Sequence, residues 1–366
     1  MIFKRIYFIL YFILLSTTLN AQYVGIGCMY DYNDSSLIFD MDYSGNISIK
    51  GIIPTGRGDR RVSISKDGLV LIANDVYFPP DLVSLSILKI NDNGDVVKIR
   101  DIDLGGRALE VKITDDNKYA LVFHGIVGDN PLNNIDYGIS VFEINENDVI
   151  TPAKSFFSMY NLFDLSEFDL TSYGLIIGYN VYNLHLLKLN GDGEITDTGK
   201  TFNIPNRSEI VITQDDKLAL LACLSPDDLY VLNIDGDNVS YSGTSINTSG
   251  INANGIVVTP NSRVILQSLF GYVAVYDISE THNVTFRQEF SIYELAQSIG
   301  MTPDGNFAVV SYDFTPSHGK LSSFRIYPDG TVLELKKEAT TPSGCVAIAF
   351  YQIPQTSVET DWQMYK

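Results

Sequence analysis

The sequence predicts an all-β protein, a seven-bladed β-propeller whose closing blade is shared between N- and C-terminal strands. Three observations carry this prediction. An apolar pair leads into a polar turn seven times, a hairpin with a Gly, Asn or Asp tip accompanies each turn, and the two chain ends read as parts of one blade. Two motifs that repeat in phase indicate a ring of similar units.

The first repeat is the turn that follows the apolar pair. Its equivalent positions are Ser65, Thr114, Thr171, Thr213, Thr259, Thr302 and Ala349. They lie 49, 57, 42, 46, 43 and 47 residues apart, which is the length of one four-stranded blade. The turn that starts at Thr302 reads Thr-Pro-Asp-Gly and fits a type I turn, because Pro presets φ at the second position.

The second repeat is a hairpin between two runs of alternating polarity. The tips fall at residues 39–46, 90–95, 144–148, 189–193, 234–238, 278–283 and 326–330. Gly, Asn and Asp tolerate the positive φ angles of tight hairpins. Seven hairpins therefore accompany seven turns, which supports the blade count independently.

The two chain ends complete each other. Cys345 to Phe350 reads as an innermost strand, whereas the runs at 23–30, 37–41 and 47–51 lack an inner partner. We expect the C-terminal strand to lie innermost in the blade whose other strands come from the N-terminus. This arrangement removes an open sheet edge and joins the ends of the chain.

The first residues have the pattern of an export signal. Lys4 and Arg5 supply a basic start, residues 6–15 are apolar, and a polar stretch ends at the small residue Ala21. We predict a signal peptide at residues 1–21, cleaved after Ala21, and a mature protein that is secreted, periplasmic or at the cell surface. The alternative is an uncleaved membrane anchor, but the apolar run is shorter than the ~20 residues that span a bilayer.

The mature chain, a single propeller at residues 22–353 with a C-terminal tail at residues 354–366, is strongly acidic. The full sequence has a net charge of −19, and loss of Lys4 and Arg5 with the leader leaves 23 basic against 44 acidic residues, a net charge of −21. Such a surface repels phosphate backbones and anionic lipid. Nucleic-acid partners and membrane insertion after signal cleavage are therefore not expected.

The three cysteines are Cys28, Cys223 and Cys345, so at least one is unpaired. Cys28 and Cys345 fall on adjacent strands of the predicted closing blade. Their register is about one residue out of opposition, which sends the side chains to opposite faces. We favour three buried thiols, with a Cys28–Cys345 disulfide as the alternative.

Sequence motifs of common enzyme sites are absent. The chain has no Gly-x-Ser-x-Gly, no His-Glu-x-x-His, no phosphate loop, no dinucleotide fingerprint and no Cys/His spacing for a metal. The acidic hairpin tips lack the ligand spacing of an EF-hand and are typical of turns. We expect no metal and no cofactor.

Charged residues gather where the innermost strands begin, at the mouth of the predicted channel. These residues are Arg60, Arg61, Arg107, Glu110, Glu167, Arg207 and Glu209. They fit two roles: ion pairs with one another that close the mouth, or a site for anion binding or catalysis. His124 ends the second strand of its blade and points to the same face, where a lone histidine is either solvated or catalytic.

Long loops lie on one side of this mouth. They are residues 74–85 with Tyr77 and Phe78, residues 124–137 with Tyr137, and residues 312–320 with Tyr312. Exposed aromatic rings give contact area at low entropic cost, so we expect these four rings, Arg61 and Glu167 to contact a ligand. The alternative is ordinary variation in loop length, which costs little stability.

The repeated turn also carries a family resemblance. The pattern apolar-x-apolar-Thr-Pro-Asp-Gly-x-apolar-Ala-apolar-Val, clearest at residues 299–310, resembles the seven-bladed lactonase-type propellers. That superfamily includes 6-phosphogluconolactonase-like enzymes and surface-layer proteins with Tyr-Val-Thr-Asn repeats. The resemblance covers nearly the whole mature chain and implies catalytic Arg, Glu and His at the mouth. The loosely corresponding residues are Arg107, Glu110, His124, Arg207 and Glu209.

These observations predict an exported propeller that acts as a binding or interaction module through its mouth face. Its partner would be a protein, a glycan or a small molecule. The alternative is a metal-independent lactone hydrolase of the 6-phosphogluconolactonase-like type, and a third possibility is a passive structural surface protein. The histidine that often precedes the turn motif in such enzymes is missing here, so we favour the binding module.

Overall fold

The computed structural model describes residues 22–29, 35–56, 58–75, 83–127, 135–145, 149–158, 167–179, 183–203, 206–225, 228–247, 251–315 and 318–354. Within these ranges the chain forms twenty-six strands and no helix, and thus no helix of the length and apolarity that crosses a membrane. The predicted signal peptide and the residues after 354 lie outside the described ranges.

In chain order the strands are β1 (Tyr23–Met29), β2 (Ser35–Met41), β3 (Ile47–Pro54), β4 (Asp59–Ile64), β5 (Leu69–Asn74), β6 (Leu85–Ile90), β7 (Val96–Ile102), β8 (Ala108–Ile113), β9 (Tyr119–Val127), β10 (Ile135–Ile144), β11 (Val149–Ser158), β12 (Glu167–Leu170), β13 (Leu175–Tyr179), β14 (Asn183–Leu189), β15 (Ile195–Asn203), β16 (Asn206–Ile212), β17 (Leu218–Ser225), β18 (Asp228–Asp235), β19 (Asn238–Asn247), β20 (Ile251–Val258), β21 (Val264–Ile278), β22 (Val284–Met301), β23 (Phe307–Thr315), β24 (His318–Ile326), β25 (Val332–Thr341) and β26 (Cys345–Gln352).

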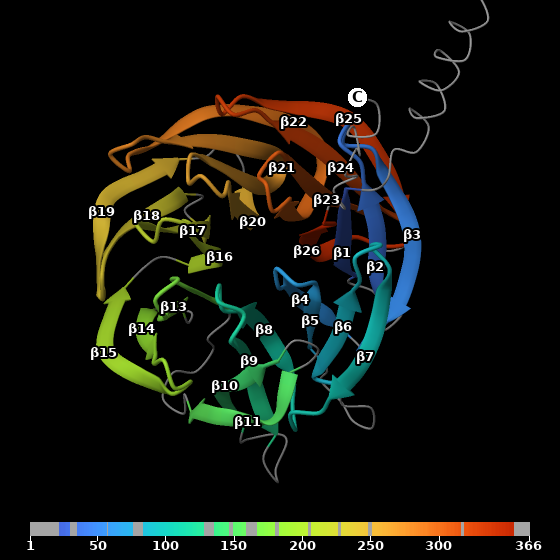
Figure 1. Ribbon diagram of the computed structural model, residues 1–366. Helices are drawn as coiled ribbons and strands as arrows, with labels where there is room; N and C mark the ends of the chain where they lie inside the picture. The colour runs from blue at the N-terminus through green and yellow to red at the C-terminus, as the bar shows by residue number, and fades with distance from the viewer. Residues whose placement is uncertain are drawn as a thin grey trace, which may run out of the picture.

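The described strands pair into six antiparallel sheets. Five have four strands each, in the orders β26-β1-β2-β3, β4-β5-β6-β7, β11-β10-β9-β8, β12-β13-β14-β15 and β16-β17-β18-β19, and the sixth runs from β20 to β25. Figure 1 shows the sheets around a common centre, with β4, β8, β16, β20 and β26 innermost and β3, β7, β11, β15 and β19 at the periphery. The all-β, propeller-like architecture predicted from the sequence is confirmed.

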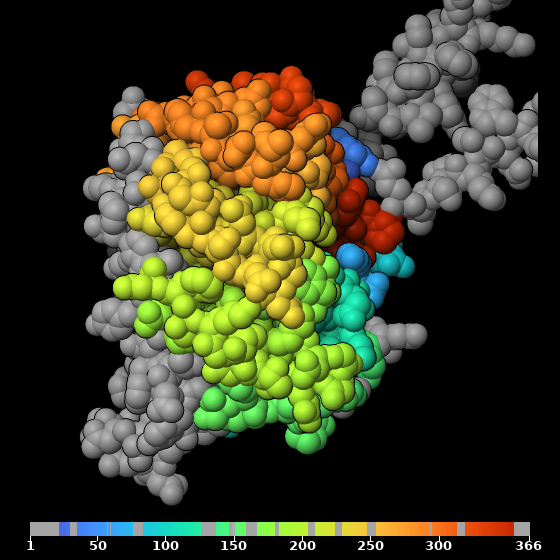
Figure 2. Space-filling model, turned by 90° about the vertical axis from the view of Figure 1, so that its left-hand side faces the viewer, coloured from blue at the N-terminus to red at the C-terminus, as the bar shows by residue number. Residues whose placement is uncertain are grey.

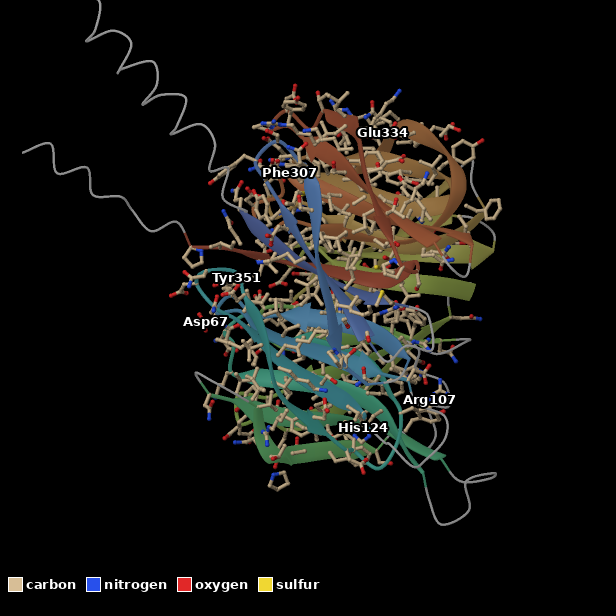
Figure 3. All side chains as sticks on the ribbon, turned by 90° about the vertical axis from the view of Figure 1, so that its right-hand side faces the viewer. Asp67, Arg107, His124, Phe307, Glu334 and Tyr351 are labelled. Atoms are coloured by element: carbon tan, nitrogen blue, oxygen red, sulfur yellow. The ribbon has the colours of Figure 1, made fainter. Side chains whose placement is uncertain are left out.

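The outer surface follows the order of the chain. Figure 2 shows neighbouring units stacked from the green segment near residue 150 to the orange segment near residue 290. Figure 3 shows the two ends of the ring, with Arg107 and His124 at one end and Asp67 and Tyr351 at the other. We call the end with Arg107 the channel mouth.

The repeated turn is built by a side chain as well as by the backbone. Thr302 Oγ1 donates a hydrogen bond to Asp304 Oδ1 (2.8 Å) and accepts one from the N–H of Phe307 (3.0 Å). The same two hydrogen bonds recur at Thr114, Thr213 and Thr259. The third residue after the anchor has a positive φ at Gly68, Asn117, Gly174, Asp216, Ser262 and Gly305. Gly, Asn and Asp dominate these positions because they tolerate left-handed backbone.

Two strands of the sixth sheet are unusually long. β21 has 15 residues and β22 has 18. The register between them shifts next to Gly271, whose φ is +81°, and the register between β22 and β23 shifts near Gln297. Each long strand therefore consists of two segments joined by a bend.

The two chain ends share a sheet. β26 pairs antiparallel with β1, with Ile26 opposite Ala349, and an irregularity near the end of β1 places Met29 opposite Cys345. Cys28 and Cys345 are thus out of opposition, as their predicted register requires. No disulfide joins these two residues or Cys223, and all three thiols are buried.

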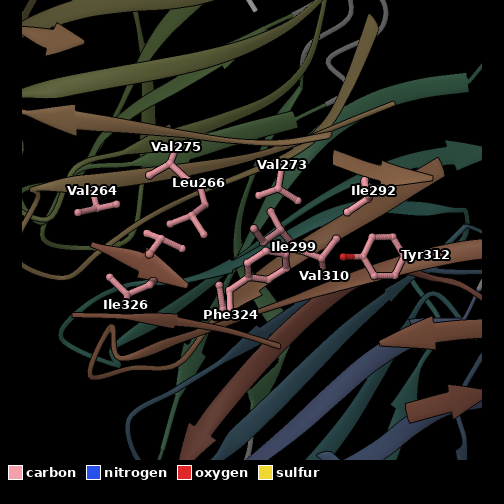
Figure 4. Close-up of a cluster of buried hydrophobic side chains, with 13 residues drawn as sticks. Val264, Leu266, Val273, Val275, Ile292, Ile299, Val310, Tyr312, Phe324 and Ile326 are labelled. Atoms are coloured by element: carbon pink, nitrogen blue, oxygen red, sulfur yellow. The ribbon is translucent and has the colours of Figure 1, made fainter. Parts of the chain in front are cut away.

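The hydrophobic core lies between neighbouring sheets. Figure 4 shows one cluster, in which Val264, Leu266 and Val275 of one side meet Phe324 and Tyr312 of the other. Both faces of the middle strands contact a neighbouring sheet, so that a strand such as β5 is buried at all six residues.

The prediction of a long loop at residues 312–320 is wrong. β23 continues to Thr315 and β24 begins at His318, so most of this segment is a strand hairpin. Tyr312 is only 4% exposed because its ring packs into the apolar cluster of Figure 4. Burial of apolar area outweighs exposure of the ring at a loop tip.

Candidate functional site

The inner strands carry side chains toward the centre of the ring at two levels. Four residues before the repeated turn lie Arg61, Glu110, Glu167 and Glu209, and two residues before it lie Ser63, Lys112, Asp169 and Val211. Residues two apart on a strand share a face. The equivalent positions on β20, β22 and β26 carry Gly255, Ser298 and Cys345, then Val257, Gly300 and Ala347. Charge is therefore confined to the side of the ring formed by β4, β8, β12 and β16.

Arg61 ties three sheets together. Its Nε lies 3.3 Å from Glu110 Oε2, and its Nη2 contacts Glu167 Oε1. Both glutamates are only 3% exposed, whereas 18% of the arginine side chain remains exposed. The structure thus brings together three of the predicted residues, as ion pairs with one another. Removal of Arg61 would take away the counterion that the two buried carboxylates share.

Carboxylates on one inner strand also form an ion pair or hydrogen bonds with a neighbouring inner strand. Asp169 lies 3.4 Å from Lys112 Nζ, and its Oδ2 accepts a hydrogen bond from the N–H of Ile212 (2.8 Å). Glu209 Oε2 accepts a hydrogen bond from the N–H of Ile256 (2.9 Å). These bonds satisfy backbone donors at the free edges of the inner strands, where no further strand can pair.

Glu209 has an unusual protonation equilibrium. Burial raises the pKa of its carboxyl to about 7, although Arg61 and Lys112 nearby favour the charged form. Burial likewise raises the pKa of Glu110 against the same two cations. A carboxyl group that titrates near neutral pH can both accept and donate a proton at physiological pH. The carboxyl group of Glu209 is therefore suited to proton transfer at this pH.

A second ion cluster at the mouth is centred on Asp75, which the sequence analysis missed. Asp75 Oδ1 lies 2.6 Å from Arg107 Nε, and Oδ2 lies 3.1 Å from Arg107 Nη2 and 2.8 Å from Arg60 Nη1. Asp75 Oδ2 thus accepts hydrogen bonds from both arginines, and Oδ1 adds an ion-pair contact with Arg107 Nε.

β-bulges decide these pairings. The register of β8 shifts between Ala108 and Glu110, and that of β4 shifts between Asp59 and Arg61. One extra residue reverses the alternation of side chains. Arg107 pairs with Asp75, and Glu110 pairs with Arg61.

His124 is not the solvated mouth residue that was expected. β9 continues three residues beyond it, and the imidazole is only 3% exposed, with Nε2 2.7 Å from Ser140 Oγ and the ring 5.6 Å from that of Phe156. Burial lowers the pKa of His124 to about 4, so that the ring is neutral at pH 7. This neutral, enclosed ring fills a strand interface.

The remaining predicted site residues fall into two groups. Tyr137 stacks on Phe123 with ring centroids 5.8 Å apart and packs against a buried cluster, and Tyr312 is buried as described above. Tyr77, Phe78 and the side chain of Arg207 lie outside the described residues. Of the four aromatic residues predicted to contact a ligand, the two that the structure describes, Tyr137 and Tyr312, thus pack against the protein.

We call Arg60, Arg61, Asp75, Arg107, Glu110, Lys112, Glu167, Asp169 and Glu209 the mouth cluster. Asp75, Lys112 and Asp169 were missed as site residues. Two of them, Lys112 and Asp169, carry a readable signal, since they lie two residues before the repeated turn. In the described part of the chain no group of three or more His, Cys, Asp or Glu side chains could hold a metal ion.

No family model and no curated protein matches the sequence. Solved structures share the fold. A putative 6-phosphogluconolactonase from Bacteroides fragilis aligns with a TM-score of 0.73 and 15% identity over 92% of this chain and 99% of its own. The periplasmic gluconolactonase of Pseudomonas aeruginosa gives 0.70 and 12% over 91% and 99%. A functionally unknown protein from Desulfotomaculum acetoxidans gives 0.72 and 17% over 90% and 99%. The chain therefore has the fold of the lactonase-type propellers.

Proposed function

We propose that the protein is an exported module that binds a small polar ligand at the channel mouth. The observation that carries this proposal is the guanidinium of Arg61, which two buried glutamates fix while part of its side chain still reaches solvent. Side chains that are held in place before binding lose little conformational entropy when a ligand arrives. A few fixed polar groups also provide specificity for a ligand.

We also infer that the ring has seven blades. Five are the four-stranded sheets, and one of these, β26-β1-β2-β3, closes the ring by joining the two ends of the chain. The sixth blade consists of β20, β21 and the first segment of β22, and the seventh consists of the second segment of β22 with β23, β24 and β25. A signal peptide at residues 1–21, the propeller at 22–353 and a tail at 354–366 complete the proposed organisation.

The binding proposal is tested by calorimetric titration of the mature chain with a panel of lactones, glycans and free sugars. We expect saturable binding of at least one compound, weakened about tenfold in Glu167→Gln because Arg61 loses one of its two anchors. The control is Glu280→Gln, which removes the same charge from an 88% exposed side chain at the β21–β22 hairpin tip. Absence of binding across the panel contradicts the proposal.

Lactone hydrolysis is the second candidate, and Glu209 is the observation that favours it. A carboxylate with a pKa of about 7 can take a proton from water, and Arg61 and Lys112 nearby can stabilise an oxyanion. The solved neighbours named as lactonases have the same fold. We expect a hydrolase to lose about a hundredfold or more in turnover in Glu209→Gln but not in Glu280→Gln. Turnover that survives Glu209→Gln would remove Glu209 from the reaction.

A further inference from the structure

Asp75 occupies the place in the mouth cluster where an anionic ligand would bind. Its Oδ2 accepts hydrogen bonds from Arg107 Nη2 and Arg60 Nη1, and its Oδ1 lies within ion-pair distance of Arg107 Nε, so that two arginines surround the carboxylate as they would a ligand carboxylate or phosphate. Only 16% of its side chain is exposed, against 34% for Arg60 and 13% for Arg107. A ligand anion would have to displace Asp75 to reach the fork.

The backbone holds Asp75 in this position. Its N–H donates a 2.9 Å hydrogen bond to Gly58 O. Gly58 has a φ of +72°, and a Cβ there would lie 2.8 Å from Asp75 O, so only glycine allows the close approach. Asp75 also follows directly on Asn74, which is fully buried at the end of β5 and donates to Ser86 Oγ (3.2 Å). Displacement of the carboxylate therefore requires a change in a well-anchored segment.

The charge of the mouth cluster does not favour anions either. It contains four cations, Arg60, Arg61, Arg107 and Lys112, and five carboxylates, Asp75, Glu110, Glu167, Asp169 and Glu209. Each of the four cations lies within salt-bridge distance of a carboxylate of the cluster. The described side chains of the cluster thus give incoming anions no net positive field, and binding of an anion would break existing ion pairs.

We propose that the channel mouth selects uncharged polyhydroxylated ligands, and that Asp75 excludes carboxylates and phosphates by filling the fork of Arg107. A hydroxyl group both donates and accepts, so it can bridge a guanidinium and a carboxylate without breaking their pair. This inference rests on the proposed function, because it names the ligand class of the same mouth.

The test uses inorganic phosphate as the probe, measured by calorimetric titration of the full mature chain at low ionic strength. We expect no saturable binding to the wild type and a gain of about tenfold or more in Asp75→Asn, which removes the Asp75 charge from both arginines. Asp75→Ala is the second variant, and melting curves establish that each is folded. The control is Asp92→Asn, which changes the net charge equally at an exposed hairpin tip and is expected to leave phosphate binding as weak as in the wild type.

Three results would overturn the inference. They are saturable phosphate binding by the wild type, folded Asp75 variants that gain no phosphate binding, and an equal gain in Asp92→Asn. If both Asp75 variants unfold, the wild-type titration decides alone. Failure of the proposed function is distinguishable, since it shows as absent binding of the uncharged lactones and glycans and leaves the phosphate result unchanged.

Discussion

Removal of the Arg61 guanidinium should destabilise the protein more than removal of any exposed charge. Arg61→Met leaves Glu110 and Glu167, each 3% exposed, without their shared counterion. An uncompensated buried charge costs about 3–5 kcal/mol, whereas an exposed ion pair contributes about 1 kcal/mol or less. Urea denaturation at pH 8 should therefore show a loss of about 3–5 kcal/mol in the free energy of unfolding.

The sign of the pH dependence follows from the two orphaned carboxylates. Burial already raises the pKa of Glu110, and loss of Arg61 removes one of the cations that oppose this rise. The folded protein then binds more protons than the unfolded chain, so the loss shrinks as pH falls from 8 to 5. Glu110→Gln and Glu167→Gln added to Arg61→Met should restore much of the stability at pH 8. A loss below about 1 kcal/mol at pH 8, or an equal loss at pH 5, would refute this reasoning.

Three other predictions concern stability. Glu209→Gln should stabilise the protein by about 1–3 kcal/mol at pH 8 but not at pH 4. Burial raises the pKa of the Glu209 carboxyl from 4.5 to about 7, so ionising this group in the folded state costs more free energy as the pH rises from 4.5 to 7. Urea denaturation at pH 4 and pH 8 measures the difference. Gly305→Ala should lower the free energy of unfolding by about 1–3 kcal/mol, since the φ of Gly305 is +70° and a Cβ would lie 2.5 Å from Pro260 Cδ. The control Gly191→Ala, with no atom within 4 Å of its Cβ, should leave the melting temperature unchanged. Deletion of residues 345–366 removes β26 and should abolish cooperative melting; a truncated chain that melts like the full one contradicts the proposed closure.

The sequence predicts the scaffold well because its signals are local. The turn at Thr302 depends on residues within five positions, since the hydroxyl of the threonine bonds Asp304 and the N–H of Phe307. Such a turn can be recognised from its residues alone. The pairing of β26 with β1 is a long-range contact, but each chain end lacks a partner in its own neighbourhood, which makes their association predictable.

The site is predicted less well because it depends on register. A single extra residue between Ala108 and Glu110 decides which side chain Arg107 faces, and no local pattern reveals that bulge. The burial of His124 depends on a hairpin that extends beyond it and on the packing of Phe156 over Gly138, where a Cβ would lie 2.3 Å from the ring. Strand length and packing of this kind are set by tertiary contacts.

Hydrogen exchange measured by mass spectrometry, with and without a bound uncharged ligand from the panel, tests the central claim most directly. If the mouth cluster binds the ligand, exchange should slow in the peptides that contain Arg60 and Arg61, Asp75, and Arg107 with Glu110. Peptides at the opposite end of the ring, around Asp67 and Tyr351, should be unchanged (Figure 3). Protection confined to that opposite end would contradict the assignment of the channel mouth as the binding site.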